Sequence, residues 1–310
     1  MRNPQLIRSI QVREMGQRIN KHLIPIFLLV FLLPSLSPAG MIVGEYMVYT
    51  VKKGDTLERV GALTGVNWWK IAKDNNIDTE KKLRIGHQLR VNARRIVPAT
   101  IVNGIIINVP DRTLYFFKNS QLVRSFPVGL GLLTSKTGRN WKTPLGKFKV
   151  IAKEKNPAWF VPPSIQEEME MEGKEVKIMV PPGPDNPLGR YAIKTSIPGI
   201  LIHETITPSS IYQFRSHGCI RVQADTMEKF FEEVELNTPG EVIYIPVKAA
   251  VSDKGRVFLE AHRDFYGQIK DLDDETRRQL EKIGAANTID WQKVQKVLKE
   301  RSGTAEDVSL

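Results

Sequence analysis

The stretch Ser216-His217-Gly218-Cys219-Ile220-Arg221 contains the only cysteine among the 310 residues of the chain. A histidine lies two positions before this cysteine, and an arginine lies two positions after it. A thiol attacks only as the thiolate, and a nearby imidazole or cation lowers the thiol pKa enough to supply one. Gly218 can adopt backbone angles that other residues avoid, which lets a substrate approach the main chain. The composition of this stretch indicates a reactive thiol.

A second histidine, His203, lies sixteen residues before the cysteine, at the end of the apolar run 199–202. A thiol and a base are the minimum equipment for acyl transfer through a thioester. A lone cysteine is most often a small buried hydrophobic residue, and a lone histidine is usually a satisfied core or surface group. Because charged and polar residues flank Cys219 on both sides, residue chemistry places catalysis only somewhat ahead of a structural role.

The pattern of His203 followed by the stretch 216–221 resembles the signature of the L,D-transpeptidases, whose catalytic domain is often called YkuD and which remodel bacterial peptidoglycan. The resemblance extends over residues 103–246 and includes the run Thr143-Pro144-Leu145-Gly146-Lys147-Phe148. The family usually has glycine after the upstream histidine, whereas this chain has Glu204.

The resemblance implies a mainly β, sandwich-like catalytic fold and an acyl transfer that needs neither a cofactor nor a metal. Cys219 would attack the amide between meso-diaminopimelate and the terminal D-alanine of a tetrapeptide stem. His203 would act as general base toward the thiol and later as general acid toward the leaving amine. Backbone N–H groups near Gly218 and Cys219 would form an oxyanion hole, worth on the order of 3 kcal/mol per donor. An amine of a second stem would then take the acyl group and give a 3→3 cross-link.

The remaining residues of the signature have supporting roles in this interpretation. Ser216 is expected to act through its main-chain carbonyl, and His217 through a hydrogen bond. Arg221 either binds the substrate carboxylate or forms a structural ion pair, and both roles stay open. Spacing does not decide which histidine is the base, although the resemblance assigns that role to His203.

Three other functions stay open at this stage. With water as the acceptor, the same site would be an L,D-carboxypeptidase. With a lysine of an envelope lipoprotein as the acceptor, it would attach a protein to the stem peptide. With an inert thiol, the chain would be a non-catalytic peptidoglycan-binding protein.

Length and charge limit the class of protein. A chain of 310 residues predicts two domains, and 41% hydrophobic residues is enough for real cores. The formal charge of +11 is spread over the first two thirds of the chain without a dense basic block. No nucleic-acid-binding motif accompanies this charge, and a polyanionic envelope polymer explains it equally well.

Residues 1–39 read as an export signal. A basic segment precedes the apolar run 23–33, which at eleven residues is too short to span a bilayer comfortably. Small residues before position 40 permit cleavage after Ala39, and retention as an uncleaved anchor is the minor alternative. The rest of the chain would lie in the periplasm or cell wall, where an unpaired thiol indicates reactivity and nucleic acid is not a natural partner.

Residues 46–92 predict a small module with the order strand, helix, helix, strand, and its first residues resemble a LysM domain. The resemblance implies binding to glycans that contain N-acetylglucosamine. The binding groove would lie between a turn and a following loop. The groove residues expected from the resemblance are Gly54, Asp55, Thr56, Asn76 and Ile77. Of the tandem tryptophans Trp68 and Trp69, at least one is expected to pack rather than to contact sugar.

The remainder of the chain divides into a β-rich domain and a charged tail. Seven short β-like runs between residues 105 and 247, and one helix near Met227, predict a sandwich or closed β fold. The insertion Pro162–Pro187 has weak strand signals and predicts a long loop near the cleft. Residues 251–310 predict a charged helical tail that docks on the catalytic domain or binds a partner. There, His262 and Asp264 are expected to form a surface pair, because no third ligand accompanies them.

Overall fold

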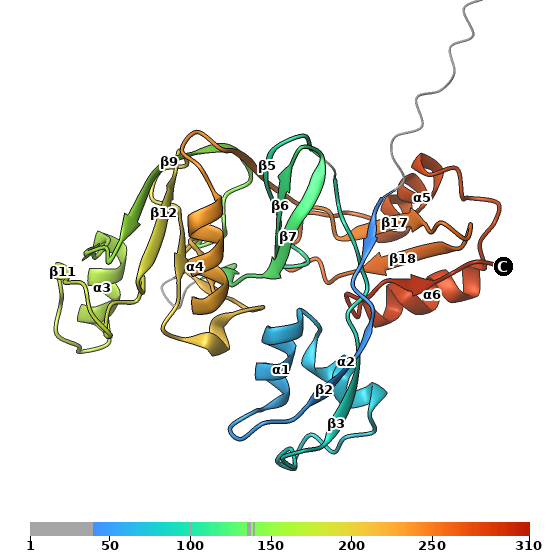
Figure 1. Cartoon of the computed structure of the whole chain (residues 1–310), viewed down its shortest axis with the longest axis horizontal. Helices are drawn as coiled ribbons and strands as arrows, with labels where there is room; N and C mark the ends of the chain where they lie inside the picture. The colour runs from blue at the N-terminus through green and yellow to red at the C-terminus, as the bar shows by residue number, and fades with distance from the viewer. Residues whose placement is uncertain (1–39, 100, 135–137, 139) are drawn as a thin grey trace, which may run out of the picture. The chain divides into compact units, whose positions relative to one another are not determined.

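The computed structural model describes residues 40–99, 101–134, 138 and 140–310 (Figure 1). The expected export signal, residues 1–39, lies outside the described residues. Within the described ranges, every helix is too short or too polar to cross a membrane.

The LysM region has the predicted βααβ order, and the two strands pair in antiparallel fashion. The first helix begins after Thr56, whose hydroxyl accepts the N–H of Arg59 at 3.2 Å. The helix ends at Gly65, which has the left-handed φ of 68° that a glycine adopts without strain. Buried aliphatic side chains of the two helices, of the second strand and of Val51, which follows the first strand, form one small core. The elements are β2 (Tyr46–Thr50), α1 (Leu57–Thr64), α2 (Trp68–Asp74) and β3 (Gln88–Asn92).

The catalytic region is built on one eight-stranded mixed sheet with the order β15-β13-β12-β9-β16-β5-β6-β7. All seven predicted runs contribute strands, so the prediction of a mainly β domain is confirmed. Two pairs are parallel, β13 with β15 and β5 with β16. The strands are β5 (Gly104–Asn108), β6 (Thr113–Lys118), β7 (Gln121–Pro127), β9 (Gly146–Lys155), β12 (Tyr191–Thr195), β13 (Leu201–Glu204), β15 (Ile220–Val222) and β16 (Pro239–Ile243).

Helix α4 (Ala224–Glu233) packs against strands β12 and β13 and confirms the predicted helix. Figure 1 shows α4 beside β12. Phe230 of α4 is fully buried and meets Phe116 and Phe126 edge to face, with ring centroids 5.5 and 5.4 Å apart. Each such aromatic side chain contributes roughly 1.5–3 kcal/mol through burial. The same core includes Ile202 of β13, the strand of His203, and Ile220 of β15, the strand that begins directly after Cys219.

Short elements connect the larger ones. The linker after the LysM module pairs with the chain that precedes it, and a parallel pair of short strands flanks the signature stretch. These elements are β1 (Ile42–Val43), β4 (Arg95–Ile96), β8 (Leu130–Gly131), the 3₁₀ helix η1 (Pro208–Ser210) and β14 (Phe214–Ser216).

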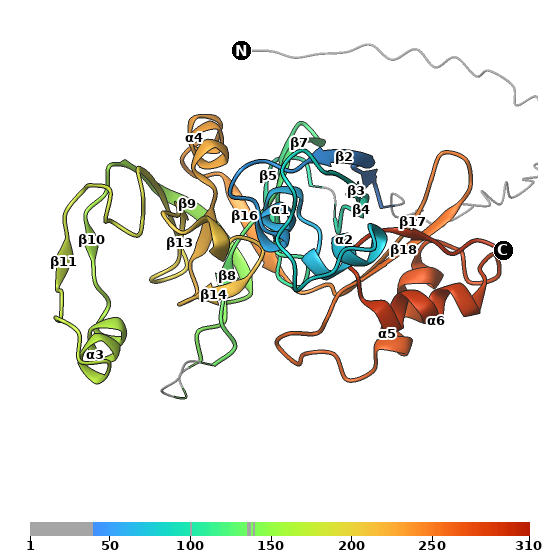
Figure 2. The ribbon, with the colours of Figure 1, turned by 90° about the horizontal axis from the view of Figure 1, so that it is seen from below.

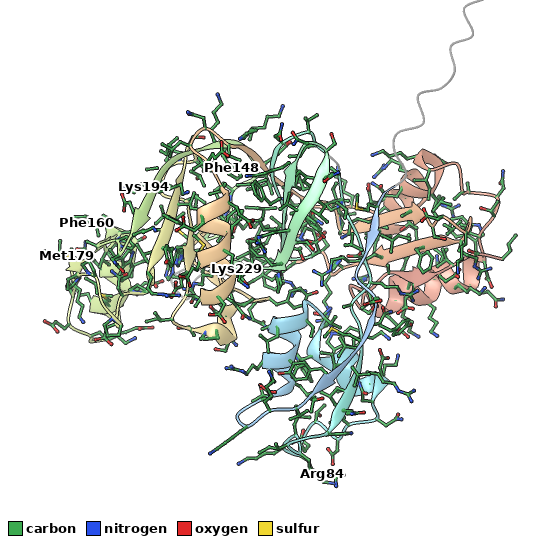
Figure 3. The ribbon with its side chains drawn as sticks, viewed as in Figure 1. Arg84, Phe148, Phe160, Met179, Lys194 and Lys229 are labelled. Atoms are coloured by element: carbon green, nitrogen blue, oxygen red, sulfur yellow. The ribbon has the colours of Figure 1, made fainter. Side chains whose placement is uncertain are left out.

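The insertion at 162–187 contains more structure than the predicted loop. It holds α3 (Pro163–Met171) and β11 (Met179–Val180), which pairs with β10 (Trp159–Phe160) just before the insertion. Figure 2 shows these elements extending away from β9 and β13. The paired Phe160 and Met179 are exposed together at the edge of the molecule (Figure 3).

The C-terminal region differs from the predicted helical tail, because it contains a three-stranded sheet beside two helices. Its buried aliphatic side chains form a separate core. All five residues of the middle strand are buried, so the run lacks the alternation that identifies a strand in a sequence. The elements are β17 (Val247–Val251), β18 (Val257–Ala261), α5 (Leu272–Lys282), α6 (Trp291–Glu300) and β19 (Glu306–Asp307).

The prediction of His262 as part of a surface pair is wrong, because its side chain is only 2% exposed. Its Nε2 donates to Glu260, while the ammonium of Lys248 donates to both Glu260 and Asp111 at 2.7 Å. These four residues are named the ionic cluster here. Three of them have the spacing of metal ligands, but the Lys248 ammonium lies between the two carboxylates and supplies the positive charge. Asp264 instead accepts the hydroxyl of Tyr244.

Candidate active site

The predicted base lies in β13, and the predicted thiol lies directly before the neighbouring parallel strand β15. In β13 and β15, His203 lies opposite Arg221, and Ile202 lies opposite Ile220. The N–H of Leu201 in β13 donates to Sγ of Cys219 at 3.4 Å, so the thiol lies against the strand that contains His203. These three residues, His203, Cys219 and Arg221, are named the thiol site.

The turn between β14 and β15 is held by its own side chains. Ser216 Oγ accepts the N–H of Gly218 at 3.2 Å and donates to the carbonyl of Cys219 at 2.6 Å. Ser216 therefore supports the turn through its hydroxyl, and its main-chain carbonyl, through which it was expected to act, accepts the N–H of Leu132 at 2.9 Å. Gly218 has a φ of +109°, and a Cβ there would lie 3.1 Å from Cδ1 of Ile200. Only glycine fits this position without strain.

The two N–H groups expected to form an oxyanion hole differ in availability. The N–H of Gly218 is engaged by Ser216. The N–H of Cys219 forms no hydrogen bond with any described residue. The N–H of Cys219 is therefore the better candidate for stabilising a negatively charged oxygen.

The half-buried thiol of Cys219 is surrounded by main-chain groups. The N–H of Leu201 donates to Sγ at 3.4 Å, and the thiol donates to the carbonyl of Gly199 at 3.5 Å. Burial raises the pKa of the thiol, whereas the Leu201 N–H and the charge of Arg221 lower it. Across the described ranges, neither imidazole forms a hydrogen bond to Sγ. Catalytic hydrogen bonds are often long until substrate binds.

His203 has one defined proton position. Its side chain is 4% exposed, and Nδ1 lies 2.6 Å from the carbonyl oxygen of Glu204. Because a carbonyl oxygen only accepts, Nδ1 carries the proton and Nε2 carries the lone pair. Burial, helped by the charge of Arg221, lowers the pKa of His203 to about 4. The hydrogen bond to the carbonyl of Glu204 opposes this shift. The ring is therefore neutral at pH 7 and able to accept a proton at Nε2.

His217 is held by residues outside the signature. Its Nε2 donates to Oε2 of Glu168 on α3 at 3.1 Å, and its ring lies 3.6 Å from that of Trp141. Burial lowers the pKa of His217, and the contact with Glu168 opposes this shift. Because a carboxylate already occupies Nε2, the geometry favours His203 over His217 as the base.

Arg221 is a cation whose charge lowers the pKa of the Cys219 thiol, against the larger effect of burial. Its side chain is half-buried, and no carboxylate in the described residues forms an ion pair with it. The charged groups that influence its pKa are the Cys219 thiol and Arg215. The structural ion pair considered as one of its two roles is therefore not found among these residues, and a positive charge is left for a ligand.

Glu204, which replaces the usual glycine, points away from the thiol. It follows His203 in β13 and stays in register opposite Val222, so its side chain lies on the other face of the sheet. Its carboxylate pairs with Arg190 at 3.3 Å, and a Cβ at Gly189 would overlap its side chain. The presence of glutamate at this position therefore leaves the backbone beside His203 in a regular strand conformation.

The LysM module has a pocket of about 660 Å³ beside its first turn. Its second wall is formed by residues 79–83 and Ile85 and not by Asn76 and Ile77. Ile77 packs against the core of the module, and Asn76 adopts a left-handed turn with a φ of 52°. Trp68 both lines the pocket and packs against that core. The predicted groove residues that line the pocket are Gly54, Asp55 and Thr56.

Sequence reasoning missed the residues that hold the signature from a distance. Glu168 lies 49 positions from His217 in the sequence and comes from the insertion. Thr143, within the quoted upstream run, donates to the carbonyl of Gly218 at 2.9 Å. Tyr266 contacts Thr143 from 123 positions away. Of these, only Thr143 carries a signal in the sequence, since it belongs to the run quoted for the family resemblance.

These features define a two-module protein, in which a LysM module is followed by a mainly β domain with an imidazole in one strand and a thiol directly before the neighbouring strand. The family model of the L,D-transpeptidase catalytic domain matches residues 103–245, and that of the LysM domain matches residues 49–92. These two domain types indicate binding to peptidoglycan.

Curated relatives extend the match beyond the single domain. The relative named "Probable L,D-transpeptidase ErfK/SrfK" of Salmonella typhimurium is 32% identical over 72% of this chain and 73% of its own length. "Probable L,D-transpeptidase YcfS" of Escherichia coli is 29% identical over 88% of this chain and 87% of its own length. A solved L,D-transpeptidase from Mycobacterium smegmatis is 14% identical over 66% of this chain and 98% of that chain, with a TM-score of 0.35. The chain belongs to the L,D-transpeptidase family, which is a family of acyltransferases.

Proposed function

We propose that Cys219 is the nucleophile of an L,D-transpeptidase that forms 3→3 cross-links between peptidoglycan stem peptides. The observation that carries this proposal is the position of His203 in β13 opposite Arg221, together with the hydrogen bond from Leu201 of the same strand to Sγ of Cys219. A thiol, a neutral imidazole with a free Nε2 and a cation together can run acyl transfer.

The first half-reaction forms a thioester. The thiol proton moves to Nε2 of His203, and Sγ attacks the carbonyl carbon between meso-diaminopimelate and the terminal D-alanine. The N–H of Cys219 stabilises the oxyanion, which is worth on the order of 3 kcal/mol for one donor. When the C–N bond breaks, His203 returns the proton to the departing amine of D-alanine.

The second half-reaction releases the enzyme. The side-chain amine of a second stem attacks the thioester carbonyl, and His203 takes a proton from that amine. The C–S bond then breaks, and the proton returns to sulfur. One amide is exchanged for another, so no ATP is required. With water as the attacking group the product is a shortened stem, and with a lipoprotein lysine it is a protein–stem conjugate.

The electrostatics of the site support this order of events. Because burial raises the pKa of the thiol, the thiol needs a base and a cation to ionise at neutral pH. His203, with a pKa lowered to about 4, is unprotonated there. The charge of Arg221 favours the thiolate and is available for the carboxylate of the stem.

The other parts of the chain are assigned to export and to binding of the substrate polymer. We propose that residues 1–39 export the chain and that it works in the periplasm or cell wall. The LysM pocket beside Gly54, Asp55 and Thr56 binds glycan strands, which keeps the catalytic domain near stem peptides. Ser216 and Gly218 fix the turn, and His217 orients it through Glu168.

A reconstituted reaction tests the proposal. The chain lacking residues 1–39 is incubated with a disaccharide-tetrapeptide, and the products are separated by mass spectrometry beside those of Cys219→Ala. Cross-linked dimers and free D-alanine are expected with the wild-type chain and absent with the variant. Free D-alanine without dimers would instead establish a carboxypeptidase, and products that persist in Cys219→Ala would exclude the thiol as nucleophile.

A further inference from the structure

A buried tyrosine beyond the matched catalytic domain contacts the segments that hold the cysteine turn. The Tyr266 hydroxyl accepts the N–H of Thr143 at 3.0 Å and donates to the carbonyl of Gly131 at 2.7 Å. Its side chain is 3% exposed and belongs to the core of the catalytic region. The family model ends at residue 245, so this contact comes from outside it.

Thr143 passes the contact to the cysteine turn. Its hydroxyl accepts the N–H of Gly131 at 2.9 Å and donates to the carbonyl of Gly218 at 2.9 Å. Thr143 is 1% exposed. Tyr266, Gly131, Thr143 and Gly218 thus form one continuous chain of buried hydrogen bonds, named the tyrosine clamp here.

The carbonyl that the tyrosine clamp holds shares a peptide plane with the N–H of Cys219. In a planar trans peptide the C=O and the following N–H point in opposite directions. Fixing the direction of the Gly218 carbonyl therefore also fixes the direction of the Cys219 N–H. That N–H has no acceptor among the described residues and is the donor assigned to the oxyanion.

The segment that presents Tyr266 is itself well anchored. The N–H of Tyr266 donates to the hydroxyl of Tyr244 at 2.9 Å, and Tyr244 donates to Asp264. Asp264 also accepts the N–H groups of Gln268 and Ile269 at 2.9 and 2.8 Å. These bonds give the tyrosine hydroxyl a fixed position.

We propose that Tyr266 is a positioning residue that aims the Cys219 N–H at the developing oxyanion, acting through Thr143 and the Gly218 carbonyl. The inference rests on the proposed thioester mechanism and assigns a role in it to the C-terminal region. Misplacement of reacting groups by about 1 Å costs about 100-fold in rate, and loss of one oxyanion donor costs about 100- to 1,000-fold. Because the donor would be loosened and not removed, a decrease of about 10- to 100-fold in the acylation rate is expected.

The test compares two buried tyrosine hydroxyls. Tyr266→Phe removes the clamp, and Tyr115→Phe removes a buried hydroxyl bonded to Asp111 at 3.0 Å in the ionic cluster. Both variants are measured, in the purified chain at a temperature where each is folded, for thioester formation from the tetrapeptide and for alkylation of Cys219 by iodoacetamide. Alkylation needs a thiolate but no oxyanion donor. It therefore distinguishes a misdirected Cys219 N–H from a general disturbance of the site.

The expected result is specific to the clamp. Tyr266→Phe lowers kcat for acylation about 10- to 100-fold with KM nearly unchanged, and its alkylation rate stays near the wild-type value. Tyr115→Phe keeps both rates. Thr143→Val reproduces the Tyr266→Phe defect, and Thr143→Ser, which keeps the hydroxyl, restores the rate.

Two outcomes overturn the inference. Acylation by Tyr266→Phe equal to that of Tyr115→Phe, or an equal loss of acylation and alkylation in Tyr266→Phe, would remove the positioning role. A wild-type chain without acylation, or an active Cys219→Ala variant, would instead contradict the proposed function, so the two failures are distinguishable.

Discussion

The thiol site and the ionic cluster each bury a histidine beside charged groups, but they differ in what remains unpaired. In the ionic cluster the Lys248 ammonium contacts two carboxylates, and Asp111 accepts further bonds from Asn108 and Tyr115. Only Nδ1 of His262 lacks a partner there. In the thiol site, by contrast, Arg221 has no carboxylate partner among the described residues, and Nε2 of His203 is free to accept a proton.

This difference separates a structural polar network from a site prepared for a ligand. A buried charge without its partner is costly, so a network that compensates every charge specifies the structure. A site that leaves a cation, a lone pair and an N–H unpaired gains its missing partners when substrate binds. Both clusters contain histidine and acidic or basic residues, so residue type alone does not distinguish them.

Replacing each of the two histidines by glutamine should give the largest difference in kcat between the thiol site and the ionic cluster. His203→Gln removes the base, and a decrease in kcat of about 100- to 10,000-fold is expected. His262→Gln leaves kcat near the wild-type value and lowers the melting temperature, because the donor to Glu260 is disturbed. Acylation kinetics and thermal unfolding of both variants check this. Equal kinetic losses in both would mean that the two sites are not separable.

Removal of the Lys248 ammonium from the ionic cluster should have the second largest effect. Lys248→Met leaves two buried carboxylates uncompensated and should lower the free energy of unfolding by about 3–5 kcal/mol. Lys73→Met is the matched control, since Lys73 pairs with Glu300 at 2.9 Å with an exposed side chain and should cost about 1 kcal/mol or less. Urea denaturation measures both changes. Similar losses in the two variants would contradict the view that the ionic cluster stabilises the fold.

Strand alternation and the family signature predicted most of the catalytic domain. The seven predicted runs contain β-branched residues between turn residues, and each became a strand. The strand β18 was missed because it contains a single β-branched residue, whereas the equally buried strand β5 contains three isoleucines and was predicted. The three-residue strands β14 and β15 were missed because polar residues interrupt them. Local pattern therefore predicted the strands that are rich in β-branched residues and failed for the short ones and for β18.

The residues of the thiol site were predictable, whereas their surroundings were not. The signature names His203, Cys219 and Arg221 within a short span of sequence. Glu168 and Tyr266 come from distant segments and only tertiary structure brings them to the site. The misassignment of His262 has the same origin, because Lys248 and Asp111, which complete the ionic cluster around its partner Glu260, come from another strand and from a distant turn. Sequence reasoning identifies groups that react and seldom identifies groups that position them.

Acid should affect the contributions of His203 and Glu260 in different pH ranges. Burial lowers the pKa of His203 to about 4 in the folded chain. As the pH falls below 6.5, this histidine therefore binds a proton in the unfolded chain before it does so in the folded chain. The folded state then loses stability between pH 6.5 and 4, by about 3 kcal/mol from this residue. The pKa of Glu260 is lowered to about 2, so its contribution is lost only as the pH falls from 4.5 toward 2. Because His262 and His217 also have lowered pKa values, the upper range includes their contributions.

Urea unfolding of the wild-type chain and His203→Gln at several pH values resolves the contribution of this histidine. The variant should show a shallower loss between pH 6.5 and 4 and the same loss below pH 4. An unchanged slope in the upper range would mean that His203 is not a neutral buried base.

The smallest effect is expected at Arg221, where two variants separate its two possible uses. Arg221→Gln removes the positive charge beside the thiol and should slow alkylation of Cys219 at pH 7 about tenfold, the effect of roughly 1.4 kcal/mol across a partly screened site. Arg221→Lys keeps the charge but loses the planar fork that binds a carboxylate through two parallel hydrogen bonds. If the guanidinium binds the stem carboxylate, Cys219 in Arg221→Lys is alkylated at the wild-type rate, and the KM of this variant for the stem peptide is raised. If the charge serves only the thiolate, both KM and alkylation in Arg221→Lys stay at wild-type values, and the unpaired cation is explained without a substrate contact.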